Sequence, residues 1–302
     1  MDFTAFQLKI QEFLPGISLK FAEPMEKHTS FRIGGPAEVM AFPKNAEELS
    51  QILKVSKLLD LEVRILGAGT NILAPDAGIP GMVICLKDCF DGMELLSGDR
   101  VWIAAGVTMA RAAMFAAGKG LSGLEFAHGI PGTVGGGVYM NAGAYGGEIC
   151  QVCESVDVMD MGGNISTYTA EEMCFSYRHS RLEDEGGIVL SAVFALTPKA
   201  ETEIREKMHE LMGKRRVSQP LDKPSAGSAF KRPVGGYAAA LIDHAGLKGY
   251  RVGDAAISEK HAGFAVNLGK ATAADVQELL HQVSDKVFEN SGIRIEPEVR
   301  IW

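Results

Sequence analysis

The spacing of apolar residues changes repeatedly along the chain, and it predicts helices and strands in an irregular order. Phe3, Phe6, Ile10, Phe13 and Leu14 recur at helical spacing and predict a first helix. Further helices are predicted over residues 46–59, 109–118, 201–217, 238–245 and 273–290. Short apolar or alternating runs predict a strand that ends at Pro43 and further strands at residues 61–66, 82–86, 101–105, 152–159, 165–168, 188–196, 255–258, 264–267 and 293–302. Because strands and helices do not alternate regularly, the fold class expected is α+β rather than a doubly wound sheet.

Polar residues that precede three of these helices are expected to cap them. Asn45 is followed three residues later by Glu48, and Thr272 by Asp275, a spacing typical of capping boxes. Thr108 is expected to cap the helix that ends near Gly118. The turn at residues 162–164 has the sequence Gly-Gly-Asn, which predicts a hairpin between the strands on either side.

Composition and charge narrow the class of protein. The 302 residues are enough for two or three domains, and the 46 % apolar and 23 % charged residues are ordinary for a globular protein. A net charge of −8 argues against a nucleic-acid surface or an anionic membrane as partner. Charges are scattered through the first twenty residues, and no run approaches the roughly 18 apolar residues of a membrane span. We therefore expect a cytoplasmic protein, either a monomer or a weak oligomer, whose partner is a small molecule.

The cysteines and histidines predict no metal site. The five cysteines are odd in number and scattered, and we expect them to be reduced. Cys150 and Cys153 form a CxxC pair, but no second Cys or His pair lies at zinc-binding spacing, and none of the seven histidines belongs to a ligand motif.

The composition changes near residue 200, where a highly charged helix begins. We therefore predict two domains, at residues 1–200 and 201–302. A loop, QPLDKPSAGSAFKRP, is predicted over residues 219–233 of the second domain.

The stretch from Leu121 to Ile149 is the most unusual in the sequence. Nine of its 29 residues are glycine, while apolar residues such as Leu124, Phe126 and Val138 can anchor it in a core. Glycine at this density costs backbone entropy on folding, so it is expected where the backbone passes close to something else. We interpret the stretch as ordered backbone against a large flat ligand. The alternative is a glycine-rich crossover with a purely structural role.

A second glycine motif follows the strand at residues 61–66. Gly67-Ala68-Gly69-Thr70-Asn71 lacks the third glycine of a dinucleotide-binding GxGxxG, and the prolines downstream disfavour the helix that such a motif needs. The loop can still offer successive N–H groups to a pyrophosphate. A plain turn between two strands is the alternative.

Three polar segments are candidates for chemistry. Arg178 can clamp a carboxylate or phosphate, or else pair with a nearby acidic side chain at the surface. Ser228 lies among small residues, with Lys231 close enough in sequence to stabilise its alkoxide, although an ordinary turn also fits. Glu298 and Arg300 would share one face of an extended strand, as an edge ion pair or as part of a site.

Six segments in order resemble the UDP-N-acetylenolpyruvoylglucosamine reductase (MurB) family, and together they span Thr29 to Arg300. They are FRIGGPA, GAGTNIL, GIPGTVGGGVYMNAGAYGGEI, SYRHSRL, SAGSAFKRP and EPEVR. The resemblance implies an FAD-binding unit of the vanillyl-alcohol oxidase type, with two subdomains divided near residues 80–100 and followed by a C-terminal α+β substrate domain. It also implies the shorter family type, because no long insertion follows Arg178 and because Gln219 stands near the position of the long form's phosphate-binding lysine.

The resemblance implies a role for each candidate residue. Arg178, Ser228 and Glu298 take the family's catalytic positions, and Tyr177, Lys231 and Arg232 would lie near the substrate or nicotinamide nucleotide. The non-covalent FAD would be contacted by Gly67, Ala68, Gly69, Thr70, Asn71, Ile130, Gly136, Tyr139, Gly143, Ile188, Arg215 and Arg300.

The activity implied is reduction of UDP-N-acetylglucosamine enolpyruvate to UDP-N-acetylmuramate, with NADPH as co-substrate. The chain would thus serve peptidoglycan precursor synthesis, and through it cell wall biogenesis, cell shape, cell division and the cell cycle. One rival hypothesis is an FAD oxidase that passes electrons to oxygen, with His128 as a possible flavin tether; we favour a structural role for His128. A non-catalytic nucleotide-binding module is the other.

Overall fold

The computed structural model describes residues 3–302 and divides them into two compact units. Unit 1 contains the chain up to Phe21, Val39–Ala68 and Pro80–Gly213, and unit 2 contains Ala22–Glu38, Gly69–Ile79 and Lys214–Trp302. Both units mix helices and strands, which confirms the α+β class. The predicted domain boundary near residue 200 falls at the start of α6, whereas the contact division falls within it; the boundary stays a prediction.

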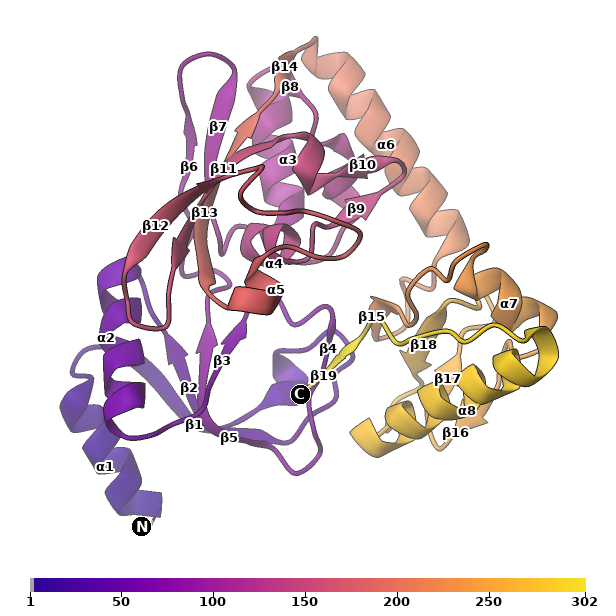
Figure 1. Cartoon of the computed structure of the whole chain (residues 1–302), viewed down its shortest axis with the longest axis horizontal. Coiled ribbons are helices and arrows are strands. Elements are labelled where there is room, and N and C mark those ends of the chain that lie inside the picture. Colours follow the sequence, from indigo (N-terminus) through magenta and orange to yellow (C-terminus); the bar gives the residue numbers. More distant parts are fainter. Residues whose placement is uncertain (1–2) are drawn as a thin grey trace. The chain divides into compact units, whose positions relative to one another are not determined.

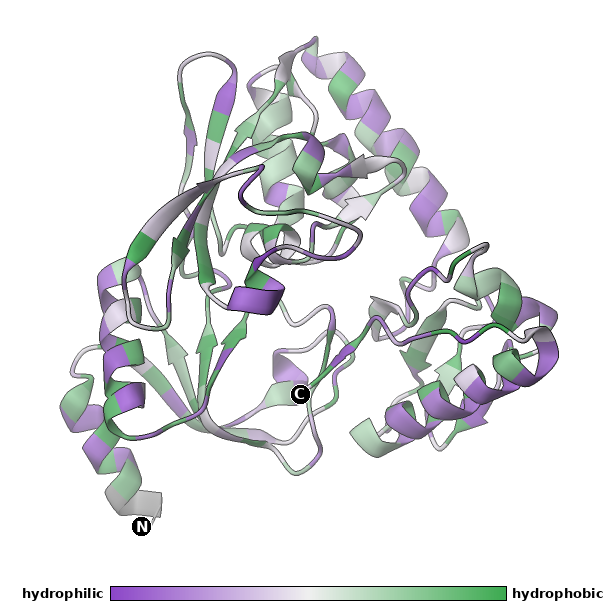
Figure 2. Ribbon diagram, in the orientation of Figure 1, coloured by the Kyte–Doolittle hydropathy of each residue, from purple (hydrophilic) through white to green (hydrophobic). Residues whose placement is uncertain are grey.

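The longer predicted helices are present (Figure 1). The helices are α1 (Phe3–Phe13), α2 (Ala46–Leu58), α3 (Met109–Gly118), α4 (Val134–Tyr139), α5 (Leu182–Glu185), α6 (Glu201–Ser218), α7 (Ala238–His244) and α8 (Ala273–Ser291), with 3-10 turns η1 (Met25–Lys27), η2 (Glu125–Gly129) and η3 (Ile149–Gln151). The short α4, inside the glycine-rich stretch, was not predicted. Figure 2 shows α6 as mostly hydrophilic, as its charged sequence indicated.

All three predicted caps are confirmed. The side chains of Asn45, Thr108 and Thr272 each accept a hydrogen bond from the backbone N–H three residues on. At Thr272 the capping box is complete, because the Asp275 carboxylate also accepts the N–H of Thr272. At Asn45 the box is only half formed, since the Glu48 carboxylate accepts the N–H of Lys44 instead.

A five-stranded antiparallel sheet forms the centre of unit 1. Its order is β12-β11-β13-β7-β6, with β6 (Met93–Leu95), β7 (Arg100–Ala104), β11 (Cys153–Met159), β12 (Ile165–Thr169) and β13 (Ile188–Ala195). The predicted hairpin joins β11 and β12, with Met159 opposite Ile165 and Gly163 at a φ of +87°. Buried side chains of this sheet share one core with α3 and α4, among them Val156, Phe194 and Val138.

A second sheet has the order β1-β2-β5-β3, and its strands are β1 (Ser18–Pro24), β2 (Pro36–Phe42), β3 (Val63–Leu66) and β5 (Ile79–Cys85). Helices α1 and α2 share its core in unit 1, where Leu49, Ile52 and Leu53 of α2 are at most 2 % exposed. β3 and β5 are parallel. The described strands also form three two-stranded pairs. They are β4 (Ile72–Leu73) with β19 (Arg300–Ile301), β8 (Leu121–Ser122) with β14 (Thr197–Pro198), and β9 (Gly143–Ala144) with β10 (Gly147–Glu148).

Unit 2 is built on a third sheet, of order β15-β18-β17-β16. Its strands are β15 (Ser225–Ser228), β16 (Arg251–Val252), β17 (Ala255–Ile257) and β18 (Phe264–Asn267). Helix α8 packs on β16 and β17 through an apolar face at helical spacing. The members of this face are all at most 2 % exposed: Val276, Leu279, Leu280, Val283 and Val287.

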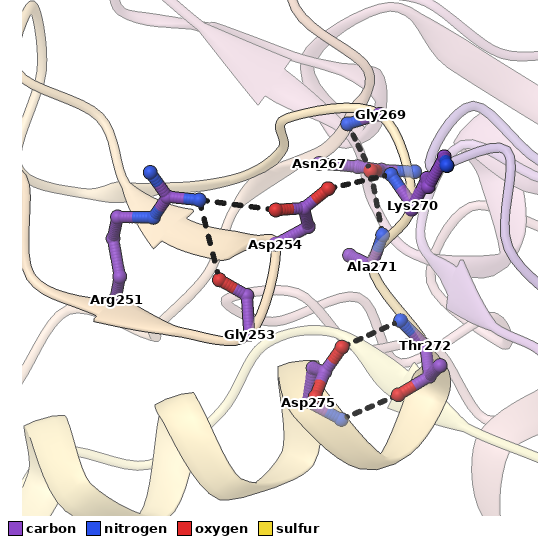
Figure 3. A network of polar contacts seen from close by, with 9 residues as sticks. All are labelled: Arg251, Gly253, Asp254, Asn267, Gly269, Lys270, Ala271, Thr272 and Asp275. Atoms are coloured by element: carbon purple, nitrogen blue, oxygen red, sulfur yellow. Dashed lines mark hydrogen bonds and ion pairs between the residues drawn. The ribbon is translucent and has the colours of Figure 1, made fainter.

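Polar contacts tie the turns of unit 2 to the start of α8 (Figure 3). The Asp254 carboxylate accepts hydrogen bonds from Arg251 and from the N–H of Lys270. The Asn267 side-chain oxygen accepts the N–H groups of Gly269 and Ala271. These contacts fix the short loop that joins β18 to the capping box of α8.

Two sequence predictions about unit 2 are wrong. The predicted loop over residues 219–233 contains strand β15, because its small residues allow pairing with β18 around an irregular register between Ser225 and Ser228. The predicted strand over residues 293–302 is regular only at β19. Upstream of β19, Pro297 has no N–H to donate and forms an isolated bridge with Phe230, so the segment changes partner along its length.

Candidate functional site

The glycine-rich stretch is anchored in the core of unit 1, as predicted. Leu124, Phe126, Val134, Val138 and Ile149 are at most 7 % exposed. The stretch contains η2, α4 and the β9–β10 pair, so it is ordered secondary structure and no linker.

The three consecutive glycines of α4 differ in how much room the surrounding protein leaves for a side chain. A Cβ added to Gly135 would lie 2.9 Å from the Cβ of Ala105, and one added to Gly137 would lie 2.8 Å from the Sδ of Met109. A side chain at Gly135 would therefore press on Ala105, and one at Gly137 would require the flexible end of Met109 to move. Gly136 is different: it is exposed, and a Cβ there would meet only its own cap, Thr133 Oγ1, at an ordinary 3.6 Å. An exposed helical glycine costs about 1 kcal/mol relative to alanine, and protein packing does not account for this one.

Ile130, Tyr139, Gly143 and Ile188, which are also expected to contact FAD, lie in unit 1. Ile130 and Tyr139 are partly buried and pack against the core. Gly143, at the start of β9, allows close approach of β10, because a Cβ there would lie 2.8 Å from the carbonyl oxygen of Gly147. Ile188, at the start of β13, is buried opposite Met159.

The Tyr177–Arg178 pair occupies the tip of a tight turn in unit 1. Ser176 and His179 exchange backbone hydrogen bonds of 3.1 and 3.2 Å, and Arg178 has a left-handed φ of +56°. The guanidinium lies 5.4 Å from the centre of the Tyr177 ring and donates to the carbonyl oxygen of Gly143 at 3.4 Å. Asp184, an acidic residue close to Arg178 in the sequence, has its Oδ2 3.1 Å from Nε2 of His179. The turn thus joins Arg178 to the glycine-rich stretch.

The Gly67–Asn71 loop connects β3 to β4 and is followed by no helix, as predicted. Its two glycines are needed by the protein itself. A Cβ on Gly67 would lie 2.6 Å from Thr133 Oγ1, and one on Gly69, which has a φ of +62°, would overlap the carbonyl oxygen of His28. The loop is therefore a turn between two strands, as one of the two interpretations of the sequence held. The binding of a pyrophosphate by Gly67, Ala68, Gly69, Thr70 and Asn71 stays a prediction.

In unit 2 the backbone segments that carry Ser228 and Glu298 lie next to each other. The N–H of Glu298 donates to the carbonyl oxygen of Ala229 at 2.8 Å, one residue beyond Ser228. Ser228 is exposed at the end of β15, between the buried Ala226 and Ala229, and Gly227 has a φ of +76°. Sequence spacing of 70 residues gave no indication of this proximity.

Asn71 fixes the segment that carries Glu298 and Arg300. Its side-chain amide donates to the carbonyl oxygen of Glu298 at 3.2 Å, and its own carbonyl oxygen accepts the N–H of Arg300 at 3.0 Å. The glycine loop and the C-terminal segment are thereby joined within unit 2. Glu298 and Arg300 are both half-buried.

The remaining predicted residues also belong to unit 2. The Nζ of Lys231 lies 3.6 Å from the exposed carboxylate of Glu296, and its action on Ser228 stays a prediction. The guanidinium of Arg232 lies over the Tyr237 ring at 4.4 Å. Arg215 lies on α6, near its C-terminal end.

Two family models match the chain, one in each half. Residues 37–169 match an FAD binding domain, and residues 219–302 match the C-terminal domain of UDP-N-acetylenolpyruvoylglucosamine reductase. The UDP-N-acetylenolpyruvoylglucosamine reductase of Agathobacter rectalis is 47 % identical over 98 % of each chain, and that of Streptococcus pneumoniae 43 % identical over 97 % of each. The chain belongs to this reductase family. The crystal structure of MurB from Thermus caldophilus is similar, with a TM-score of 0.81, 38 % identity and coverage of 95 % of this chain and 98 % of that one.

These matches confirm the family resemblance and the expected two-part fold. The FAD-domain match covers the Gly67–Asn71 loop and the whole glycine-rich stretch, and the C-terminal match covers Ser228, Glu298 and Arg300. Arg178 lies between the two matched regions. The residues present also fit FAD, because the open space over Gly136 leaves room for a flat ring against backbone.

Sequence reasoning did not identify the hydrogen bonds that hold the candidate side chains in place. Thr133, Asn141 and Ser180 are buried polar residues. The side chains of Thr133 and Ser180 bond to backbone of the glycine-rich stretch, and the Asn141 amide donates from that stretch to the carbonyl oxygen of Ser176. Their pattern in the sequence is that of ordinary turn residues, and only burial distinguishes them.

Proposed function

We propose that this protein is an FAD-dependent oxidoreductase that reduces UDP-N-acetylglucosamine enolpyruvate to UDP-N-acetylmuramate at the expense of NADPH. The observation that carries the proposal is the match to curated reductases of this name over 98 % of both chains. The product is a precursor of peptidoglycan, so the proposed place of action is the cytoplasm, with consequences for cell wall biogenesis, cell shape, cell division and the cell cycle. Among the described residues no helix could span a membrane. A monomeric or weakly oligomeric state is part of the proposal.

Bound FAD would supply the hydride chemistry, accepting from NADPH and giving to the enolpyruvyl group. The protein must then stabilise the negative charge that develops on the substrate's carboxylate as its double bond is reduced. Arg178 would do so with its guanidinium, and Glu298 by sharing a proton or hydrogen bond. Ser228 would donate the proton that completes the reduction, a general-acid step typically worth ~10²–10⁴ in rate.

The other predicted residues have supporting roles in this proposal. Tyr177, Lys231 and Arg232 would bind substrate or nicotinamide nucleotide. FAD would be held, without a covalent bond, by the Gly67–Asn71 loop, Ile130, Gly136, Tyr139, Gly143, Ile188, Arg215 and Arg300. Support comes from Gly136, whose exposed position allows a ring to rest on the backbone, and from the contact between Arg178 and Gly143.

A visible spectrum of the purified protein tests the proposal. NADPH should bleach the flavin absorbance in the absence of air, and UDP-N-acetylglucosamine enolpyruvate should restore it. The Ser228→Ala variant should be reduced by NADPH at the normal rate but reoxidised by the substrate ~10²–10⁴-fold more slowly. The matched control is Ser218→Ala, which alters an exposed serine at the end of α6. Rapid reoxidation by air without the enolpyruvyl substrate would instead indicate an oxidase.

A further inference from the structure

Three hydrogen bonds connect the Arg178 turn to the glycine-rich stretch in unit 1. The Ser180 hydroxyl donates to the carbonyl oxygen of Tyr139 at 2.8 Å, and the Asn141 amide donates to that of Ser176 at 3.0 Å. The third bond is that of the Arg178 guanidinium to Gly143. Both ends of the turn are therefore fixed, independently of the arginine itself.

Asn141 is the central residue of this connection. It is 1 % exposed and has a left-handed φ of +42°, a conformation that asparagine tolerates better than most residues. Its amide makes two donor bonds, to Ser176 and to the Glu148 carboxylate at 2.9 Å, and its oxygen accepts the N–H of Cys150 at 3.0 Å. Both N–H groups of the amide are thus used, and a ligand has no access to the side chain.

The carbonyl oxygen of Ser176 is the point at which Asn141 acts on the turn. This oxygen accepts the N–H of His179, which closes the turn, and also the amide of Asn141. Arg178 lies between Ser176 and His179 and has a left-handed backbone conformation, which a loop without these hydrogen bonds would not keep. Two bonds on one acceptor therefore fix the direction in which the Arg178 side chain leaves the backbone.

We infer that Asn141 is a positioning residue for Arg178, with Ser180 as its second support on the other side of the turn. This inference rests on the proposed function, because it assigns Arg178 the task of stabilising charge on the substrate. A displacement of about 1 Å in a catalytic group can lower a rate about 10²-fold, so a hydrogen bond far from the substrate is enough to matter.

The test is Asn141→Asp in the FAD-loaded protein. Aspartate has nearly the same size, but it loses both donor bonds and sets a carboxylate against the Glu148 carboxylate and the Ser176 carbonyl. We expect reoxidation of the flavin by the enolpyruvyl substrate to slow about 10- to 100-fold, with FAD content and reduction by NADPH within twofold of the parent. The matched control is Asn45→Asp, since aspartate caps a helix as well as asparagine does.

A double-mutant cycle with Arg178→Lys separates positioning from general damage. If Asn141 acts through Arg178, Asn141→Asp should slow the Arg178→Lys enzyme by less than threefold. Independent, multiplicative effects would overturn the inference, as would normal reoxidation in Asn141→Asp. Failure of the parent protein to reduce the enolpyruvyl substrate would overturn the proposed function instead.

Amide hydrogen exchange gives a readout that needs no activity. Peptides covering residues 174–182 should exchange at least tenfold faster in Asn141→Asp, because the N–H of His179 is released with the turn. Unchanged exchange there would contradict the inference. If Asn141→Asp folds poorly, the Ser180→Ala variant provides the test instead. It should show the same slower reoxidation and the same faster amide exchange over residues 174–182. Normal reoxidation and exchange in Ser180→Ala would contradict the inference.

Discussion

The exposed glycine in α4 offers a direct test of where the flavin binds. In Gly136→Ala the new Cβ would meet only Thr133 Oγ1, at 3.6 Å, so the folded protein can accept the methyl group without moving its neighbours. Alanine is favoured over glycine within a helix by about 1 kcal/mol. The apoprotein should therefore gain up to about 1 kcal/mol in its free energy of unfolding.

The effect on FAD should have the opposite sign. If the flavin rests on the backbone at Gly136, the methyl group occupies ligand space. Overpacking by one methyl group typically costs about 1–3 kcal/mol, which corresponds to roughly 5- to 150-fold weaker binding. A variant that is more stable without cofactor, yet binds its cofactor less well, cannot be explained by general damage to the fold.

Urea unfolding of the apoprotein and titration of FAD by its fluorescence measure the two quantities separately. The matched control is Gly213→Ala in α6, where an added Cβ would meet no atom within 4 Å. This variant should show the gain in stability but no change in FAD affinity. Unchanged FAD affinity in Gly136→Ala would refute the assignment of the flavin to this face of α4, and a destabilised apoprotein would refute the argument from open space.

Two further predictions concern thiol reactivity and helix capping. Burial raises the pKa of Cys85 to about 11 and that of Cys153 to about 12, so both thiols should stay protonated at pH 8 and react with a thiol reagent only after denaturation. The exposed Cys174 should react in the native protein. Rapid labelling of Cys153 in the native protein, located by mass spectrometry, would contradict this prediction. Asp76→Ala removes a carboxylate that accepts two backbone N–H groups in the first turn of α8, and it should lower the free energy of unfolding by about 0.5–2 kcal/mol in urea, against a change within about 0.5 kcal/mol for the exposed Asp222→Ala.

Local sequence signals predicted the parts of the fold that depend on local physics. The capping box of Thr272 and Asp275 specified the start of α8, and the helix extends to Ser291 as expected from the sequence. The hairpin turn at Gly163 was specified in the same way by its glycines. In each case neighbouring residues provide both the start signal and the hydrogen-bond partners.

Pairings between distant segments had no such signal. Strand β15 was missed because its small residues have weak strand preference and gain order only by pairing with β18. The regular part of the C-terminal strand was overestimated because Pro297 interrupts the ladder and the segment bonds in turn to two different partners. The family resemblance supplied the candidate residues, but it did not indicate which buried polar groups hold them.

The side chain of Asn71 has a partner that sequence reasoning did not predict. The family resemblance implied that Asn71 contacts FAD. Its side-chain amide donates to the carbonyl oxygen of Glu298, and its own carbonyl oxygen accepts the N–H of Arg300. If the loop binds FAD as proposed, its asparagine also holds the backbone that carries the proposed catalytic Glu298. Asn71 would then serve both the cofactor and the segment that carries Glu298. A substitution at Asn71 would consequently alter the substrate's reduction as well as FAD affinity, whereas a loop that served only the pyrophosphate would alter affinity alone.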